Sequence, residues 1–257
     1  MEWSFTQVFF ALLGFVLGGG IGGIIAIALG EISVTADGTT EVSSVGIFIT
    51  VVAQVGGALL VLAYLSRTKG TGSFAADFGL RVRLRHWWGI PAGAGLQVGA
   101  ALVTAPLIQL LFPEGPPQQS IAGVTEGTDS ALGVVLILLS LVVLAPLAEE
   151  LIFRGMLLSR LVRSMAMWWA IVVQAAVFAL IHLADPEAIA AIPGLFLIAA
   201  VLGYAAIKTG SLSLPIFLHA GVNLTAALLL LYGEPLLDWL DELSGLEPAE
   251  SLIRALF

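Results

Sequence analysis

Residues 131–154 read ALGVVLILLSLVVLAPLAEELIFR. The stretch opens with an uncharged apolar run, and about 20 helical residues are enough to cross the roughly 30 Å of bilayer hydrocarbon. It ends on two adjacent glutamates, Glu149 and Glu150, followed by Arg154. A charged side chain at the bilayer centre costs about 2.5–3.5 kcal/mol, so charges in such a segment indicate a function. We therefore predict a membrane-spanning helix that carries chemistry near its end.

The whole chain has the composition of a membrane protein. Of its 257 residues 59% are hydrophobic and 11% charged, with a mean hydropathy of +1.04. Soluble domains are about 45–50% apolar and about 25% charged. No period-2 alternation favours a β-barrel, so each span must satisfy its own backbone hydrogen bonds as a helix. We predict an all-α, polytopic membrane helix bundle of about seven transmembrane helices, near 5–29, 46–65, 89–112, 131–158, 166–184, 189–207 and 212–232.

The domain organisation is simple, since the sequence has no long linker and no repeat. We expect a single transmembrane domain over 1–233, with the motif-bearing core in 131–232, and a short acidic tail over 234–257. The tail has apolar residues at the spacing of an amphipathic interfacial helix, and these are Leu236, Trp239, Leu240 and Leu243.

Charge and cysteine content exclude several classes of protein. The net charge is −8, so no basic stripe could neutralise nucleic-acid phosphates. With no cysteine, disulfide frameworks, thiolate zinc sites and cysteine nucleophiles are excluded. Gly14, Gly18 and Gly22 repeat at the spacing that lets two helices approach closely. Internal packing is the favoured explanation for this glycine face, and a homo-oligomer contact through it stays open.

Polar residues recur at helical spacing in the later spans. Phe178 and His182 lie four residues apart in the fifth predicted span, and His219 and Asn223 do so in the seventh. Residues at i and i+4 share a helix face. Estimated at about 1.5 Å per residue, the depths of these groups overlap with that of Glu149 near mid-membrane. His182 comes out deepest, which calls for a tilted or broken fifth helix.

The two adjacent glutamates are predicted to differ in role. Arg154 lies four residues after Glu150 and can neutralise it, whereas Glu149 points about 100° away and is free to face a cavity. Pro146, just before the pair, should kink the helix. A carboxylate and an imidazole can deprotonate a water, while further His and Asn groups can stabilise an oxyanion. Ser140 and Ser159 have no histidine at local spacing, so a serine mechanism is less favoured.

In order along late spans, the motifs Glu149-Glu150-x-x-x-Arg154, Phe178-x-x-x-His182 and His219-x-x-x-Asn223 resemble those of the CAAX-protease and bacteriocin-processing (CPBP) family. Its eukaryotic members are the type II CAAX prenyl endopeptidases. The resemblance covers residues 149–223 and implies an intramembrane glutamic endopeptidase. Its substrate would be a membrane-embedded or lipid-linked peptide. Because the chain has no cysteine and its candidate ligands are dispersed, we expect neither a cofactor nor a metal.

The resemblance also implies a role for each motif residue. Glu149 would be the general base and His182 would help to bind the attacking water. His219 and Asn223 would form the oxyanion site. Glu150 and Arg154 would order the residues around the water, with Phe178 in a supporting position.

Two other functions remain compatible with the same residues. Two histidines and a glutamate are legitimate zinc ligands, although the His-Glu-x-x-His spacing of zinc proteases on one helix is missing. The alternative to an enzyme is a polytopic regulator or a proton-coupled carrier, in which these residues would relay protons.

The orientation follows from the basic residues, which mark cytoplasmic loops. With a cytoplasmic N-terminus, all of them except Arg254 fall on the cytoplasmic side, namely Arg67, Lys69, Arg81, Arg83, Arg85, Arg154, Arg160, Arg163 and Lys208. The opposite loops carry Glu31, Asp37, Glu41, Glu114, Glu126, Asp129, Asp185 and Glu187. We expect a cell-membrane protein with its N-terminus inside and its C-terminus outside.

This topology is tested by reporters fused to the C-terminus. A reporter that is active only outside the cytoplasm should give signal, and one that is active only in the cytoplasm should be silent. The opposite pair of results would contradict the predicted orientation.

Overall fold

The computed structural model of the chain describes residues 3–34, 40–115, 117 and 130–244. Among these residues, six helices are long and apolar enough to cross a membrane, and Ser213–Leu229 is a shorter apolar helix. The predicted all-α, polytopic membrane bundle is confirmed. The predicted tail beyond residue 244, and the acidic residues Asp37, Glu126 and Asp129, lie outside the described residues.

The first long helices are α1 (Phe5–Ala28), α2 (Ser44–Lys69) and α4 (Gly89–Leu111), and the later ones are α9 (Met167–Ile181) and α10 (Ile192–Thr209). The last helix, α11 (Ser213–Ser244), contains the shorter apolar segment. The fourth span is a continuous helical run of changing type, made of α6 (Ala131–Leu138), η2 (Leu139–Leu144), α7 (Ala145–Glu150), η3 (Leu151–Leu158) and α8 (Ser159–Leu161). Short connecting elements are β1 (Ile32–Val34), β2 (Thr40–Val42), α3 (Phe74–Phe78), η1 (Leu84–His86), η4 (His182–Ala184) and η5 (Pro186–Ala191).

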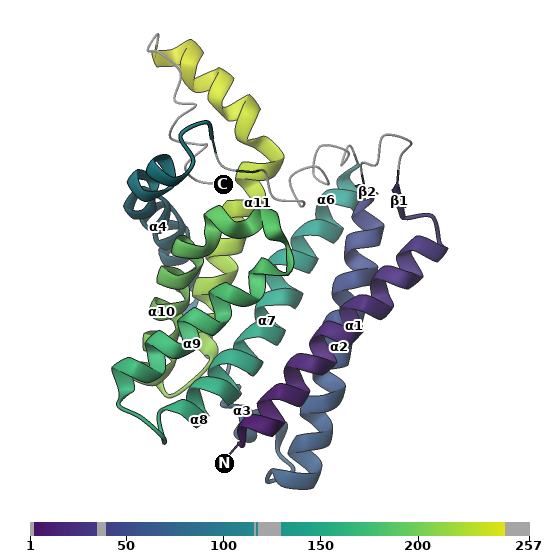
Figure 1. Cartoon of the computed structure of the whole chain (residues 1–257), viewed down its shortest axis with the longest axis vertical. Helices are drawn as coiled ribbons and strands as arrows, with labels where there is room; N and C mark the ends of the chain where they lie inside the picture. The colour runs from purple at the N-terminus through teal and green to yellow at the C-terminus, as the bar shows by residue number, and fades with distance from the viewer. Residues whose placement is uncertain (1–2, 35–39, 116, 118–129, 245–257) are drawn as a thin grey trace.

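The fourth span occupies the centre of the molecule. Figure 1 shows it between the α1–α2 pair on one side and the α4, α9, α10 and α11 group on the other. Helices α4 and α11 pack together, as do α9 and α10. The residues that the sequence singled out for chemistry therefore lie on the central helix and on its neighbours α9 and α11.

Glycines bring α1 and α2 into backbone contact. A Cβ atom added to Gly18 would lie 2.4 Å from the Ala53 carbonyl oxygen, and one added to Gly22 would lie 2.7 Å from the Thr50 Cα. Both glycines are buried. The glycine face of α1 thus serves internal packing, as favoured above, and α2 occupies the surface that a homo-oligomer contact would need.

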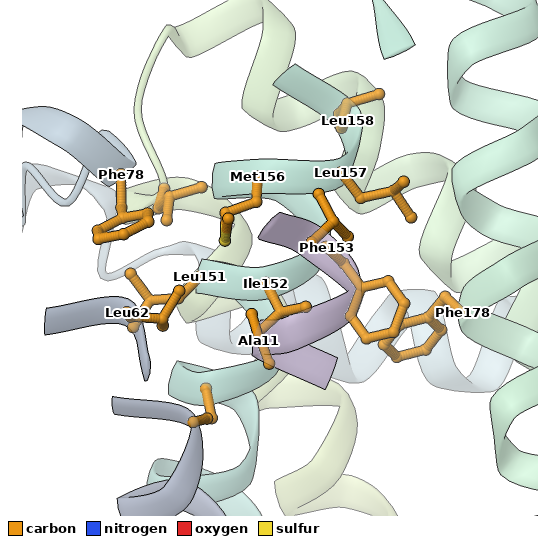
Figure 2. Close-up of a cluster of buried hydrophobic side chains, with 14 of the residues drawn as sticks. Ala11, Leu62, Phe78, Leu151, Ile152, Phe153, Met156, Leu157, Leu158 and Phe178 are labelled. Carbon is orange, nitrogen blue, oxygen red and sulfur yellow. The ribbon is translucent and has the colours of Figure 1, made fainter. Parts of the chain in front are cut away.

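Apolar side chains of the fourth span fill the space between the two groups of helices. Figure 2 shows Leu151 beside Leu62, Ile152 beside Ala11 and Phe153 beside Phe178. The whole segment Leu151–Leu158 is buried. Because successive side chains of this segment reach different neighbours, the segment fixes α1, α2 and α9 around one axis.

A second close contact holds α11 against α4. A Cβ on Gly93 would lie 2.1 Å from the Leu218 carbonyl oxygen, and one on Gly221 would lie 2.1 Å from the Ile90 carbonyl oxygen. At the start of α11, the Ser213 hydroxyl donates to the Arg83 carbonyl at 3.2 Å and accepts from the Arg83 N–H at 2.8 Å. Helix α11 is therefore held from its first turn. It continues through Gly233 without interruption, so the helix expected in the tail starts as a continuation of the last span.

Substitution of Gly18 tests the α1–α2 contact. Gly18→Val should lower the free energy of unfolding by about 1–3 kcal/mol, because the side chain overlaps the α2 backbone. Gly20→Val is the matched control, since a Cβ at Gly20 meets no atom within 4 Å. Thermal melts in detergent, combined with light scattering, separate the two roles of this face. A Gly18→Val protein that keeps its stability but changes its oligomeric state would contradict internal packing.

Candidate active site

The fourth span changes its hydrogen-bonding register around the predicted motif. Segments Leu139–Leu144 and Leu151–Leu158 are π-helical, and the short α-helix Ala145–Glu150 lies between them. Proline lacks an N–H and its ring clashes with the carbonyl four residues back, so an ordinary α-helix is strained at Pro146. The π-turn widens the helix there, and the Ala145 N–H donates to the Ser140 carbonyl. The distortion expected from Pro146 thus takes the form of a π-segment.

Glu150 and Arg154 form a buried ion pair. Arg154 Nη1 donates to Glu150 Oε1 at 2.7 Å, and the exposed fraction of both side chains is 0%. Arg154 Nη2 also donates to the Ala199 carbonyl of α10 at 3.1 Å. The guanidinium carbon lies 4.8 Å from the centre of the Phe178 ring, within cation–π range. The predicted neutralisation of Glu150 by Arg154 is therefore present, with α9 and α10 enclosing it.

His219 lies between the two glutamates. Its Nδ1 is 2.9 Å from Glu150 Oε1 and its Nε2 is 3.6 Å from Glu149 Oε2. Because a carboxylate only accepts, the Nδ1–H donates to Glu150. The Glu149 side chain is 16% exposed, whereas that of Glu150 is fully buried. The two glutamates thus contact opposite edges of one imidazole, and only Glu149 keeps access to the surroundings.

His182 lies where the fifth helix breaks. Helix α9 ends at Ile181 and a 3-10 turn begins at His182, as its estimated depth required. The Nδ1–H of His182 donates to the Phe178 carbonyl at 2.8 Å, which leaves Nε2 free of that bond. The ring of Phe178 is 5.0 Å from that of His182 and 5.9 Å from that of His219. The Phe178 ring therefore contacts the rings of both histidines.

Asn223 makes a contact that its spacing does not predict. Its amide Nδ2 donates to the carbonyl oxygen of Leu141, in η2, at 2.7 Å. It lies one turn after His219 on α11, as expected, but its described bond goes to the backbone of the fourth span. The structure thus brings together Glu149, Glu150, Arg154, Phe178 and His219. His182 lies against the Phe178 ring, and Asn223 is bonded one turn after His219.

Gln174 is a polar residue that sequence reasoning missed. It is fully buried on α9, one turn before Phe178, and its amide atoms have no hydrogen-bond partner within the described residues. A Cβ on Gly203 would come within 2.8 Å of its Oε1. The rule that found the other residues, a polar side chain in an apolar span, applies to Gln174 as well. The Ala199 and Leu141 carbonyls have no such signal, because backbone acceptors are invisible in a sequence.

Neither a serine nucleophile nor a metal cage is built at this site. Ser140 donates to the Leu136 carbonyl and Ser159 to the Arg154 carbonyl, so both hydroxyls are bonded to backbone. Within the part of the chain that the structure describes, no three His, Asp or Glu side chains are grouped as metal ligands. Glu150 already accepts from Arg154 and His219, which leaves Glu149 as the carboxylate available for chemistry.

Comparison with known families places this segment. Residues 131–225 match the family model described as type II CAAX prenyl endopeptidase Rce1-like. Residues 131–225 thus form a domain similar to the type II CAAX prenyl endopeptidases. The family is one of hydrolases within the CPBP group, so the resemblance seen in the motifs is confirmed. No curated protein and no solved structure matches the chain. The Rce1-like segment contains all seven motif residues, and the first three spans precede it.

The ion pair predicts unequal effects of the two glutamates on stability. Glu150→Gln should lower the free energy of unfolding by about 3–5 kcal/mol, because Arg154 becomes a buried charge without a counter-charge. Glu149→Gln should cost less than about 1 kcal/mol, since its carboxylate is partly exposed and lies outside the pair. Unfolding of both variants in detergent measures the difference. Equal losses would contradict the assignment of Glu150 as the partner of Arg154.

Proposed function

We propose that this chain is an intramembrane endopeptidase in which Glu149 activates the water that attacks the peptide bond. The observation that carries the proposal is the difference between the two glutamates. Glu150 is fully buried and bonded to Arg154 and His219, whereas Glu149 is 16% exposed and lies 3.6 Å from Nε2 of His219. A general base needs access to water and freedom to gain a proton, and Glu149 has both.

Proton transfer by Glu149 gives a balanced hydrolysis. The carboxylate takes one proton from water, and the hydroxide oxygen bonds to the carbonyl carbon of the peptide. The protonated Glu149 then gives that proton to the departing amine as the carbon–nitrogen bond breaks. His182 supports this step because its Nδ1–H is committed to Phe178, so the Nε2 lone pair can accept a hydrogen bond from the same water.

His219 is the proposed donor to the oxyanion. Its Nδ1–H donates to Glu150, whose charge is held by Arg154, so the imidazole is fixed by a chain of charge-assisted bonds. In the doubly protonated form, Nε2–H points to the edge where Glu149 and the substrate carbonyl would meet. Oriented donors of this kind are commonly the largest single contribution to catalysis of acyl transfer.

The substrate class follows from where the site lies. The reacting groups project from membrane-spanning helices, which supports a membrane-embedded or lipid-linked peptide as substrate. The matching family acts on CAAX prenyl substrates, so a farnesylated Cys-a-a-X peptide with a fluorophore and quencher is the first probe. The proposed orientation, with the N-terminus inside, puts the basic loops on the cytoplasmic side of the site.

Comparing cleavage by the native protein and by Glu149→Gln tests the proposal. The purified native protein should cleave the prenylated probe. If it does not, peptidomics that compares the native strain with a Glu149→Ala strain should identify membrane peptides that it cleaves. Glu149→Gln should reduce turnover at least about 100-fold, because one general base contributes about 10²–10⁴-fold. Its melting temperature should stay near that of the native protein.

A chelator series separates this mechanism from the zinc alternative. Activity should persist in strong chelator, and the purified protein should hold less than one zinc per chain. One tightly bound zinc per chain, lost together with activity, would contradict the proposal, as would a folded Glu149→Gln protein with undiminished turnover.

A further inference from the structure

The carbonyl of Leu141 has no donor from its own helix. In an α-helix it would accept from the N–H of Ala145, and in a π-helix from that of residue 146. The Ala145 N–H donates to the Ser140 carbonyl, and residue 146 is proline, which has no N–H. The π-segment and the proline together leave the Leu141 carbonyl without its usual donor in the fourth span.

An unsatisfied backbone carbonyl is costly at this depth. In the hydrocarbon region no bulk water can replace the missing donor. The only hydrogen bond to Leu141 from a described side chain comes from Asn223 Nδ2, and its length of 2.7 Å is that of a strong N–H···O bond. Asn223 is therefore the residue of α11 that completes the backbone hydrogen bonding of the fourth span.

We infer that Asn223 is a positioning residue that docks α11 onto the carbonyl left free by Pro146. Its amide fixes the rotation and depth of α11 against the helix that carries Glu149 and Glu150. His219 lies one turn earlier on α11, so this bond sets how its imidazole reaches the glutamates. The effect of this bond on catalysis rests on the proposed function, but the docking of α11 does not depend on it.

Two further contacts make the docking specific. On the opposite side of α11, Gly93 and Gly221 permit backbone contact with α4. One turn before Asn223, His219 Nδ1–H donates to Glu150. Helix α11 is thus held against α4 by close packing and against the fourth span by two polar bonds. Without the Asn223 bond, only the His219–Glu150 bond holds α11 against the fourth span. The distance of 3.6 Å between Glu149 and His219 is then no longer fixed from the next turn of α11.

A double-mutant cycle between residues 146 and 223 tests the docking. Asn223→Ala should lower the melting temperature by about 5 °C in the native background, since a buried acceptor loses its donor. In a Pro146→Ala background the loss should fall to less than half. Alanine at this position restores a backbone N–H, so the Leu141 carbonyl is satisfied in either helical register. The matched control is Thr225→Ala, because the Thr225 hydroxyl donates to Gly221 within α11 and should show no coupling to residue 146.

Equal losses for Asn223→Ala in the two backgrounds would overturn the inference, as would no loss in the native one. Where Asn223→Ala fails to fold, Asn223→Leu keeps the side-chain volume and removes both amide donors. It is measured in the same two backgrounds and judged by the same difference in melting temperature. These measurements need no substrate, so they decide the docking even if the protein cleaves nothing.

Turnover of the farnesylated probe separates positioning from direct catalysis. If Asn223 is a positioning residue, Asn223→Ala in the native background lowers kcat with little change in KM. In the Pro146→Ala background, where the Leu141 carbonyl no longer needs the bond, Asn223→Ala causes no further loss of kcat. A direct oxyanion donor would instead cost the same factor, about 10²–10³-fold, in both backgrounds. That second pattern would overturn the inference while leaving the proposed peptidase activity intact.

Discussion

The buried chain Arg154–Glu150–His219 is the interaction on which the rest of the site depends. A carboxylate and a guanidinium at membrane depth are tolerable only as a pair, because each alone carries a large desolvation cost. Their shared oxygen, Glu150 Oε1, also accepts from His219. Arg154 is in turn bonded to the Ala199 carbonyl and stacked on Phe178. One ion pair therefore connects the fourth span with α9, α10 and α11, and it determines which edge of His219 faces Glu149.

The adjacent glutamates gain different roles from their positions relative to this chain. Both lie at the end of α7, where the helix passes into the second π-segment. Glu150 points toward Arg154 and is sealed from its surroundings, and Glu149 reaches the other edge of the same imidazole with part of its side chain exposed. A catalytic carboxylate must exchange protons, whereas a structural one must keep its charge. The proposed function assigns the first role to Glu149 and the second to Glu150, which face different directions because they are neighbours on a helix.

The features predicted from the sequence are those that depend on hydrophobic periodicity and on the cost of burying a charge. Apolar runs gave the helix bundle, and i, i+4 spacing gave the Glu150–Arg154 pair and the shared face of Phe178 and His182. The estimated depth of His182 called for a tilted or broken fifth helix, and α9 ends just before that residue. The hairpin β1–β2 was not predicted, since its strands have three residues each. The bond of Asn223 to Leu141 was missed for a different reason, because it depends on a backbone acceptor and on a change of helical register.

The π-segments show why that change of register matters for function. A proline in an α-helix interior is expected to bend the helix and expose a carbonyl, which is a defect in hydrocarbon. Here the fourth span widens before Pro146 instead, and the Ala145 N–H goes to Ser140, so the Leu141 carbonyl loses its helical donor. Another helix supplies the donor, and that helix is the one that carries His219. A backbone irregularity of the fourth span thus serves as the attachment point of α11. The position of His219 then depends on a bond that forms only when α11 sits at the correct depth and rotation, so assembly of the bundle and alignment of the site are one event.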